Sequence, residues 1–172
     1  MNMEKRKHSA PLLEWKGSAP ASLAARKMEP ESIMRMMDGA RIAERRRHTV
    51  LVVSFDHDAI RFKEDALGHF GYRVKSAATV ADALELFRGG GISLVLSECQ
   101  MPEINAISML RGYLDHSATA KVILITGRRF DSGSASILMN SGAAEVIERP
   151  YRLANLAFAM DAHLSITGAF AQ

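Results

Sequence analysis

Apolar residues in this chain come in short continuous runs, separated by longer segments in which apolar residues recur every three or four positions. Short runs rich in β-branched residues are typical of strands that are buried on both faces of a parallel sheet. A further segment alternates apolar and polar residues, as an outer strand does. The predicted strands cover residues 49–53, 72–76, 92–96, 121–126 and 144–148, with the alternating one at 72–76.

Helical periodicity follows each predicted strand, and glycines such as Gly71 and Gly142 end helices. The predicted helices cover residues 58–70, 79–87, 105–114, 131–141 and 152–166. Strands that alternate with helices form βαβ units, which build a parallel sheet with helices on both sides. The sequence therefore predicts a doubly wound α/β domain of five strands and five helices over residues 48–166, with sites at the carboxyl ends of the strands.

Residues 1–47 lack this pattern and contain prolines, glycines and scattered charges. We expect a basic, largely disordered extension with a short helix over residues 31–47, and a C-terminal tail at 167–172. Leu12, Leu13 and Trp15 form a small apolar group within the extension. That group is either a docking patch or an isolated aromatic in a flexible segment.

The 172 residues are 48% hydrophobic and 24% charged, which fits one globular domain plus additional chain. Residues 1–48 hold 11 Lys and Arg against 6 Asp and Glu, a net charge of +5. The rest carries a net charge of −2, so the basicity belongs to the extension and not to the domain. No DNA-reading module fits in that extension, and we expect no nucleic-acid partner, although nucleic-acid binding through the extension stays an alternative.

Cys99 is the single cysteine, which excludes an intramolecular disulfide and suits a reducing cytoplasm. The six histidines show no spacing typical of metal ligands. The most apolar stretch, residues 153–170, is interrupted by Asp161 and His163 and predicts a core helix, not a membrane span. We therefore expect a cytoplasmic protein with no membrane contact.

Polar residues end three of the predicted strands. Glu98, Thr126 and Arg149 occupy these ends, where side chains from parallel strands converge on one crevice. We expect Arg149 to form a bidentate ion pair with Glu98, and Thr126 to donate a hydrogen bond. The alternative is that all three are solvated loop residues.

Short segments along the chain match a known domain in order and spacing. They are VLVV at 50–53, GYRV at 71–74, Ala-Leu at 83–84, LVLSECQMP at 94–102, VILITG at 122–127 and GAAEVIERPY at 142–151. From about His48 to Leu164 the chain resembles the receiver domain of response regulators, the flavodoxin-like module of two-component signalling. This resemblance implies a flavodoxin-like fold.

The resemblance also implies where phosphorylation chemistry would lie. The family's acidic pair, which binds Mg²⁺, falls on Ser54 and Phe55, and its phosphorylated aspartate falls on Glu98. Mg²⁺ needs carboxylate and phosphate oxygens, which Ser54 and Phe55 do not supply. We therefore expect no metal and no cofactor. Without Mg²⁺ the charge of a transferring phosphoryl group is poorly stabilised, so we also expect acyl-phosphate formation to be slow.

Three further positions follow from the resemblance. The family's hydroxyl residue is kept as Thr126, its lysine is replaced by Arg149, and its switch aromatic falls on Val146. A Glu98–Arg149 pair with Thr126 either holds one permanent state, or the site has decayed and the domain is only a scaffold. The sequence leaves both versions open.

The resulting functional hypothesis is a stand-alone, non-enzymatic pseudo-receiver of phosphorelay signalling that acts by protein–protein contact. The resemblance implies a histidine kinase, regulator or output protein as partner, and a homodimer through the fourth helix, fifth strand and fifth helix. An alternative is a conventional phosphoacceptor that uses Glu98. A flavin or other small-molecule binder on the same fold is less favoured, because no aromatic loop of the expected kind is present.

Overall fold

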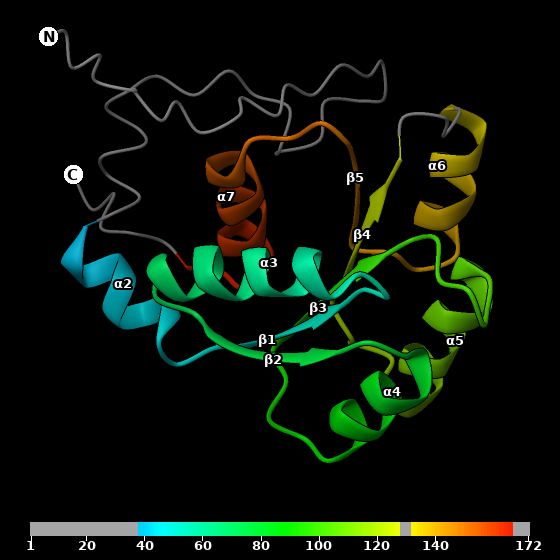
Figure 1. The fold of residues 1–172 in the computed structure, drawn as a ribbon, viewed down its shortest axis with the longest axis horizontal. Helices are drawn as coiled ribbons and strands as arrows, with labels where there is room; N and C mark the ends of the chain where they lie inside the picture. Colours follow the sequence, from blue (N-terminus) through cyan, green and yellow to red (C-terminus); the bar gives the residue numbers. More distant parts are fainter. Residues whose placement is uncertain (1–37, 128–131, 167–172) are drawn as a thin grey trace, which may run out of the picture.

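A computed structural model of the chain describes residues 38–127 and 132–166, and Figure 1 shows how they are arranged. Five parallel strands form one sheet in the order β2-β1-β3-β4-β5, which confirms the predicted doubly wound fold. The strands are β1 (Thr49–Val53), β2 (Arg73–Ala77), β3 (Leu94–Glu98), β4 (Val122–Thr126) and β5 (Glu145–Glu148). The helices are α2 (Gly39–Arg45), α3 (His57–His69), α4 (Val80–Arg88), α5 (Ala106–His116), α6 (Ser132–Asn140) and α7 (Leu153–His163).

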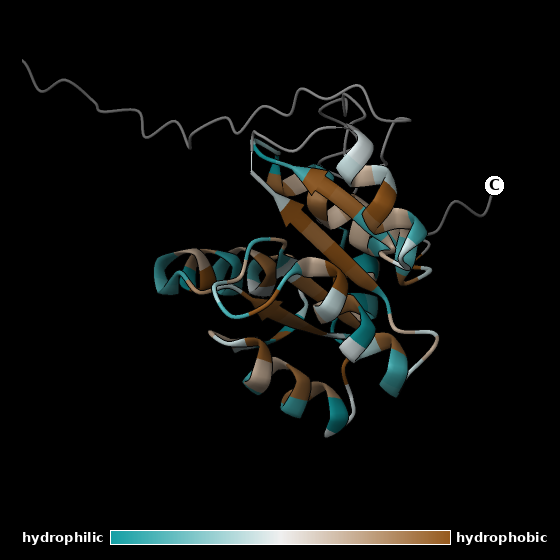
Figure 2. Cartoon of the chain, turned by 90° about the vertical axis from the view of Figure 1, so that its right-hand side faces the viewer, coloured by the Kyte–Doolittle hydropathy of each residue, from teal (hydrophilic) through white to brown (hydrophobic). Residues whose placement is uncertain are grey.

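Two apolar layers cover the two faces of the sheet. Successive side chains of a strand point to opposite faces, so Val50 and Val52 pack with α3 and α7, whereas Leu51 and Val53 pack with α4 and α5. Figure 2 shows the apolar strands between helices whose outer faces are hydrophilic. Because both faces of β1, β3 and β4 are buried, these strands are largely continuous apolar runs in the sequence, whereas the edge strand β2 alternates.

The largest displacement of a predicted strand is in β3. The sequence places this strand at residues 92–96, whereas the structure has Leu94–Glu98. Ser97 and Glu98 are buried and pair with β4 through their backbones, because the ladder needs only N–H and C=O groups. Within the described ranges, no helix combines the length and the apolar content that crossing a membrane requires.

The helix predicted over residues 31–47 is seen in its second half as α2. Asp38 is its N-cap and accepts a hydrogen bond from the backbone nitrogen of Ala40, so the helix begins after Asp38. Residues 31–37 lie outside the described residues. So do the predicted disorder of residues 1–30 and the predicted tail at 167–172.

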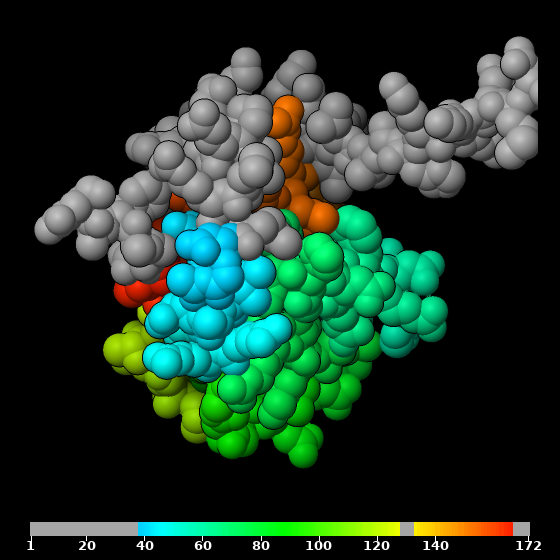
Figure 3. Space-filling view, turned by 90° about the vertical axis from the view of Figure 1, so that its left-hand side faces the viewer, coloured from blue at the N-terminus to red at the C-terminus, as the bar shows by residue number. Residues whose placement is uncertain are grey.

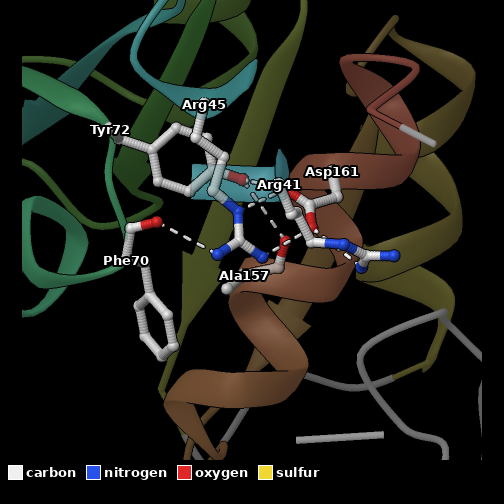
Figure 4. Close-up of polar contacts among 6 residues, drawn as sticks. All are labelled: Arg41, Arg45, Phe70, Tyr72, Ala157 and Asp161. Atoms are coloured by element: carbon white, nitrogen blue, oxygen red, sulfur yellow. Dashed lines mark hydrogen bonds and ion pairs between the residues drawn. The ribbon is translucent and has the colours of Figure 1, made fainter. Parts of the chain in front are cut away.

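Arg45 fastens α2 to the domain through a buried network (Figure 4). Its side chain is fully buried, and it donates from Nε and Nη2 to the two carboxylate oxygens of Asp161, at 2.9 and 2.7 Å. A third bond, from Nη1 to the carbonyl oxygen of Phe70, measures 3.0 Å. The Tyr72 hydroxyl also donates to Asp161, while Arg41 lies 3.4 Å from the same carboxylate.

Burial and the negative charge of Asp161 determine the pKa values of Arg45 and Tyr72. Burial disfavours charge on Arg45, but hydrogen bonding and attraction to Asp161 outweigh it and raise the pKa of the guanidinium. Burial and the negative charge of Asp161 raise the pKa of Tyr72 far above its usual value, so the phenol stays protonated and can donate. Figure 3 shows α2, in cyan, beside the red C-terminal end of α7 and the green part of the domain. Helix α2 is therefore part of the folded unit.

Gly142, which ends α6, offers a test of the packing. Its φ is +106°, and a Cβ there would lie 2.5 Å from Cδ1 of Leu114. Gly142→Ala is therefore expected to lower the free energy of unfolding by about 1–3 kcal/mol. In urea unfolding the control Gly68→Ala, where no atom lies within 4 Å, should instead gain about 0.5–1 kcal/mol. Equal effects of the two changes would contradict this account of Gly142.

Candidate functional site

In the sheet, β1 has β2 on one side and β3 on the other. The chain therefore changes the direction in which it adds strands at β1, which makes β1 the topological switch point. Crevices at such a point, outside the carboxyl ends of the strands, are where α/β sheets hold their sites. Ser54 follows β1, Glu98 ends β3, and Thr126 ends β4. Arg149 follows β5 and is joined to Pro150 by a cis peptide bond.

Glu98 is held by two cations. The ammonium nitrogen of Lys63 lies 2.7 Å from its Oε1, and Nη2 of Arg149 contacts the same oxygen. The side chains of Lys63 and Glu98 are 4% and 9% exposed, whereas that of Arg149 is 42% exposed. The Glu98–Arg149 contact predicted from the sequence is thus present, although it runs through one guanidinium nitrogen instead of two.

Lys63 on α3 is a residue of this site to which the sequence pattern assigned no role. It lies three residues after Ile60 and four before Leu67, both of which are buried. That spacing puts Lys63 on the inward face of the helix, and this was the available signal. A lysine buried there needs an anion, and Glu98 at the end of the central strand supplies it.

Thr126 does not take the part predicted for it. Its side chain is buried, but Oγ1 has no hydrogen-bond partner among the described residues, so Thr126 does not donate to the ion pair. Lys63 and Arg149 supply the contacts to Glu98 instead. Val146, at the position of the family's switch aromatic, is half-buried in β5 and packs against the α4–α5 layer.

A small hollow of about 110 Å³ opens beside the ion pairs, lined in part by Ser54, Phe55, Asp56, Glu98 and Arg149. The Ser54 hydroxyl accepts a hydrogen bond from the backbone of Asp56 at 3.2 Å. Asp56 caps α3 by accepting from two backbone nitrogens of its first turn. Phe55 is 54% exposed at the mouth of this hollow.

Two neighbouring groups titrate outside the physiological range. Burial, and then the charge of Glu98, raise the pKa of the Cys99 thiol to about 11. Burial is also the main cause that raises the pKa of Tyr151 to about 12. Both groups therefore stay protonated near neutral pH, which argues against thiolate chemistry at this site.

The sequence profile described as Response regulator receiver domain matches residues 50–161. The response regulator receiver protein CpdR of Brucella abortus is 29% identical over 112 residues, covering 62% of this chain and 88% of CpdR. The sensor kinase CckA of the same species is 29% identical over 149 residues, covering 85% of this chain but only 15% of the kinase. The match to the kinase leaves out about 26 residues of this chain. Because 38 residues precede α2, the matched region includes α2.

Solved structures agree on the fold. A response regulator receiver domain from Clostridium thermocellum superposes with a TM-score of 0.65 at 22% identity, covering 69% of this chain and 94% of that one. A CheY-like receiver domain from Methanospirillum hungatei gives 0.64 at 22% identity, with the same coverage of 69% and 94%. At this identity the likeness establishes the architecture.

Proposed function

Because this chain belongs to the response regulator receiver domain family, we propose that it is a pseudo-receiver, a module of two-component signalling that acts by protein contact without phosphorylation. The observation that carries this proposal is the state of Glu98. Its carboxylate is buried and already neutralised by Lys63 and Arg149 from inside the same chain. Both cations contact one oxygen, Oε1, and their positive charges withdraw electron density from the carboxylate, which makes it a weaker nucleophile.

The donor atoms at the site do not fit Mg²⁺, which the family uses. Mg²⁺ needs oxygen ligands in octahedral geometry, normally including one or two carboxylates. Ser54 and Phe55 offer none, Asp56 is used as a helix cap, and Glu98 faces two cations. Across residues 38–127 and 132–166, no group of three His, Cys, Asp or Glu side chains could hold a metal ion.

Lys63 supplies positive charge at this crevice from within the fold. Arg149 stands at the position of the family's lysine, and Lys63 adds a second covalently attached cation, whose ammonium nitrogen lies 2.7 Å from Glu98. Lys63 is buried on the inner face of α3, with 4% of its side chain exposed, so separating this ion pair would leave a buried charge without its partner. This supports a permanent state over a switch.

We expect the full-length chain to gain no mass when it is incubated with acetyl phosphate and Mg²⁺ and then measured by intact mass spectrometry. The physical reason is that the charge of a transferring phosphoryl group is not stabilised without a bound metal ion. A conventional receiver domain with its acidic pair and aspartate, treated in parallel, shows that the reaction works. A phosphoryl group that appears on this chain and is lost in Glu98→Gln would overturn the proposal in favour of a phosphoacceptor that uses Glu98.

Partners follow from the family and its relatives. Receiver domains of this type interact with kinases and regulators, and one relative is itself a sensor kinase. We infer that the partner is a histidine kinase, regulator or output protein of such a system. The surface of α6, β5 and α7, proposed above for partners or a homodimer, is supported by two exposed apolar side chains on α6, Ile137 and Met139.

A further inference from the structure

Strand β2 forms one edge of the sheet, and half of its backbone groups have no strand to pair with. Arg73 donates its N–H to the carbonyl oxygen of His48, which precedes β1, so Arg73 turns its backbone groups toward β1. This direction alternates along a strand, so the N–H and C=O groups of Val74 and Ser76 point away from β1. Among the described residues no strand lies on that outer side, where Figure 1 shows β2 between α3 and α4.

The same strand carries two exposed cations on one face. Arg73 and Lys75 are two residues apart, so their side chains share a face, and both are exposed. Their register partners in β1 are Thr49 and Leu51, which places them on the face that α4 and α5 cover. Val74 lies on the opposite face and packs against the layer of α3 and α7. A chain that lay beside β2 would therefore meet charges on one face and an apolar side chain on the other.

Two more cations extend this charge beyond the start of β2. Arg46 and Arg47 are exposed in the turn that leads to His48, the residue whose carbonyl oxygen accepts from Arg73. None of the four cations, Lys75 included, forms an ion pair with any residue that the structure describes. The four cations and the unpaired backbone of β2 are called here the basic edge.

The charge at the basic edge selects its occupant. A second copy of β2 would place like charges opposite Arg73 and Lys75, and an uncharged strand would leave both cations without a counter-charge. Nucleic acid would supply phosphates, but it has no row of amides to continue the ladder at Val74 and Ser76. An acidic strand does both, because its alternate carboxylates repeat at about 6.6 Å, the spacing of Arg73 and Lys75. The basic edge therefore fits an extended polypeptide segment rich in Asp and Glu.

We propose that the basic edge binds an extended acidic segment of a partner protein, which adds to the sheet as a further strand beside β2. Alternate residues of that segment are Asp or Glu and face Arg73 and Lys75, and the residues between them are apolar and lie beside Val74. Arg46 and Arg47 attract further carboxylates beyond one end of the added strand. The inference rests on the proposed function only in requiring a protein partner, and it does not involve the ion pairs of the crevice.

A short labelled peptide in which Glu and Val alternate serves as the probe, and fluorescence anisotropy measures its binding to the full-length chain. A scrambled peptide of the same composition should bind severalfold more weakly, because only alternation puts every carboxylate on one face. Arg73→Glu together with Lys75→Glu should weaken binding of the alternating peptide by about tenfold. The matched control, Arg61→Glu together with Arg111→Glu, makes the same change of charge at exposed positions on α3 and α5 and should leave binding within about twofold.

Val74→Pro tests the backbone pairing. It removes the outward N–H that the added strand would use, and an edge strand tolerates proline where its N–H faces solvent. Its control is Val74→Ala, which loses the side chain but keeps the N–H. Binding to Val74→Pro should be weaker than binding to Val74→Ala by about fivefold, and circular dichroism checks that both variants are folded.

Three results would overturn the proposal. The first is absence of binding up to about 1 mM peptide, which would leave the charges only as protection of the edge against aggregation. The second is an equal loss of binding in the control pair on α3 and α5. The third is equal binding of the two peptides and of duplex DNA, which would show capture of any polyanion. None of these results affects the expected outcome with acetyl phosphate, so the two proposals fail separately.

Discussion

Asp161→Ala is expected to lower the free energy of unfolding by about 3–5 kcal/mol, one of the largest effects of any single change in this chain. The substitution removes the counter-charge of Arg45, whose side chain is fully buried. A guanidinium left in the interior without an anion has lost its hydration, and no ion pair compensates for that loss. Urea unfolding of the full-length protein, followed by circular dichroism, measures the loss.

Two controls separate the broken ion pair from a general effect of mutation. The double change of Arg45→Met and Asp161→Leu replaces the main pair by apolar groups and should recover only part of the loss, because buried Arg41 then lacks its anion. The Tyr72 hydroxyl keeps the carbonyl oxygen of Ala157, 3.5 Å away, as an acceptor. Asp65→Ala removes an exposed carboxylate and should change stability by no more than about 0.5 kcal/mol. A loss below about 1 kcal/mol for Asp161→Ala would show that α2 is not held by this network.

Glu98→Leu is expected to destabilise the protein by about 3 kcal/mol, because it strands the buried ammonium of Lys63. Adding Lys63→Met should restore most of that stability, since neither buried charge then remains. Arg149→Ala should cost no more than about 1 kcal/mol, because this guanidinium is 42% exposed and its contact is screened by water. The same unfolding measurement ranks the three variants.

The ranking decides which cation holds the site. If Arg149→Ala costs as much as Glu98→Leu, then Arg149 and not Lys63 is the structural partner, and the proposal of an internal cation is wrong. The double variant of Lys63→Met and Glu98→Leu also separates the two functional versions. A two-component partner that binds it as tightly as the unaltered chain would make the domain a scaffold, whereas weakened binding would support a permanent state set by the charges.

The fold was predictable because both faces of the sheet are buried. A strand in that position must be apolar throughout, so a run such as residues 122–126 can be read directly from the sequence. The approach of Arg149 to Glu98 was predictable for a related reason, since parallel strands bring their carboxyl ends to one edge. Neither inference needs the positions of individual side-chain atoms.

Lys63, Arg45 and Thr126 show where sequence reasoning stops. Helical spacing indicates that Lys63 faces inward, but lysine and arginine are almost always at the surface. Only the structure shows that Lys63 and Arg45 pair with carboxylates 35 and 116 residues away along the chain. Thr126 stands at the predicted strand end, yet its hydroxyl contacts neither member of the pair. Hydrogen bonding depends on tenths of an ångström, and strand order fixes positions only to within a residue.

The sequence by itself determined the sheet, its helices and the edge at which Glu98, Thr126 and Arg149 gather, because hydrophobic burial follows a local and repetitive pattern. The tertiary structure alone decided that Glu98 has two cations and that α2 is fastened to α7. Those contacts join residues far apart in the chain, and the removal of water at each site sets which charges must pair.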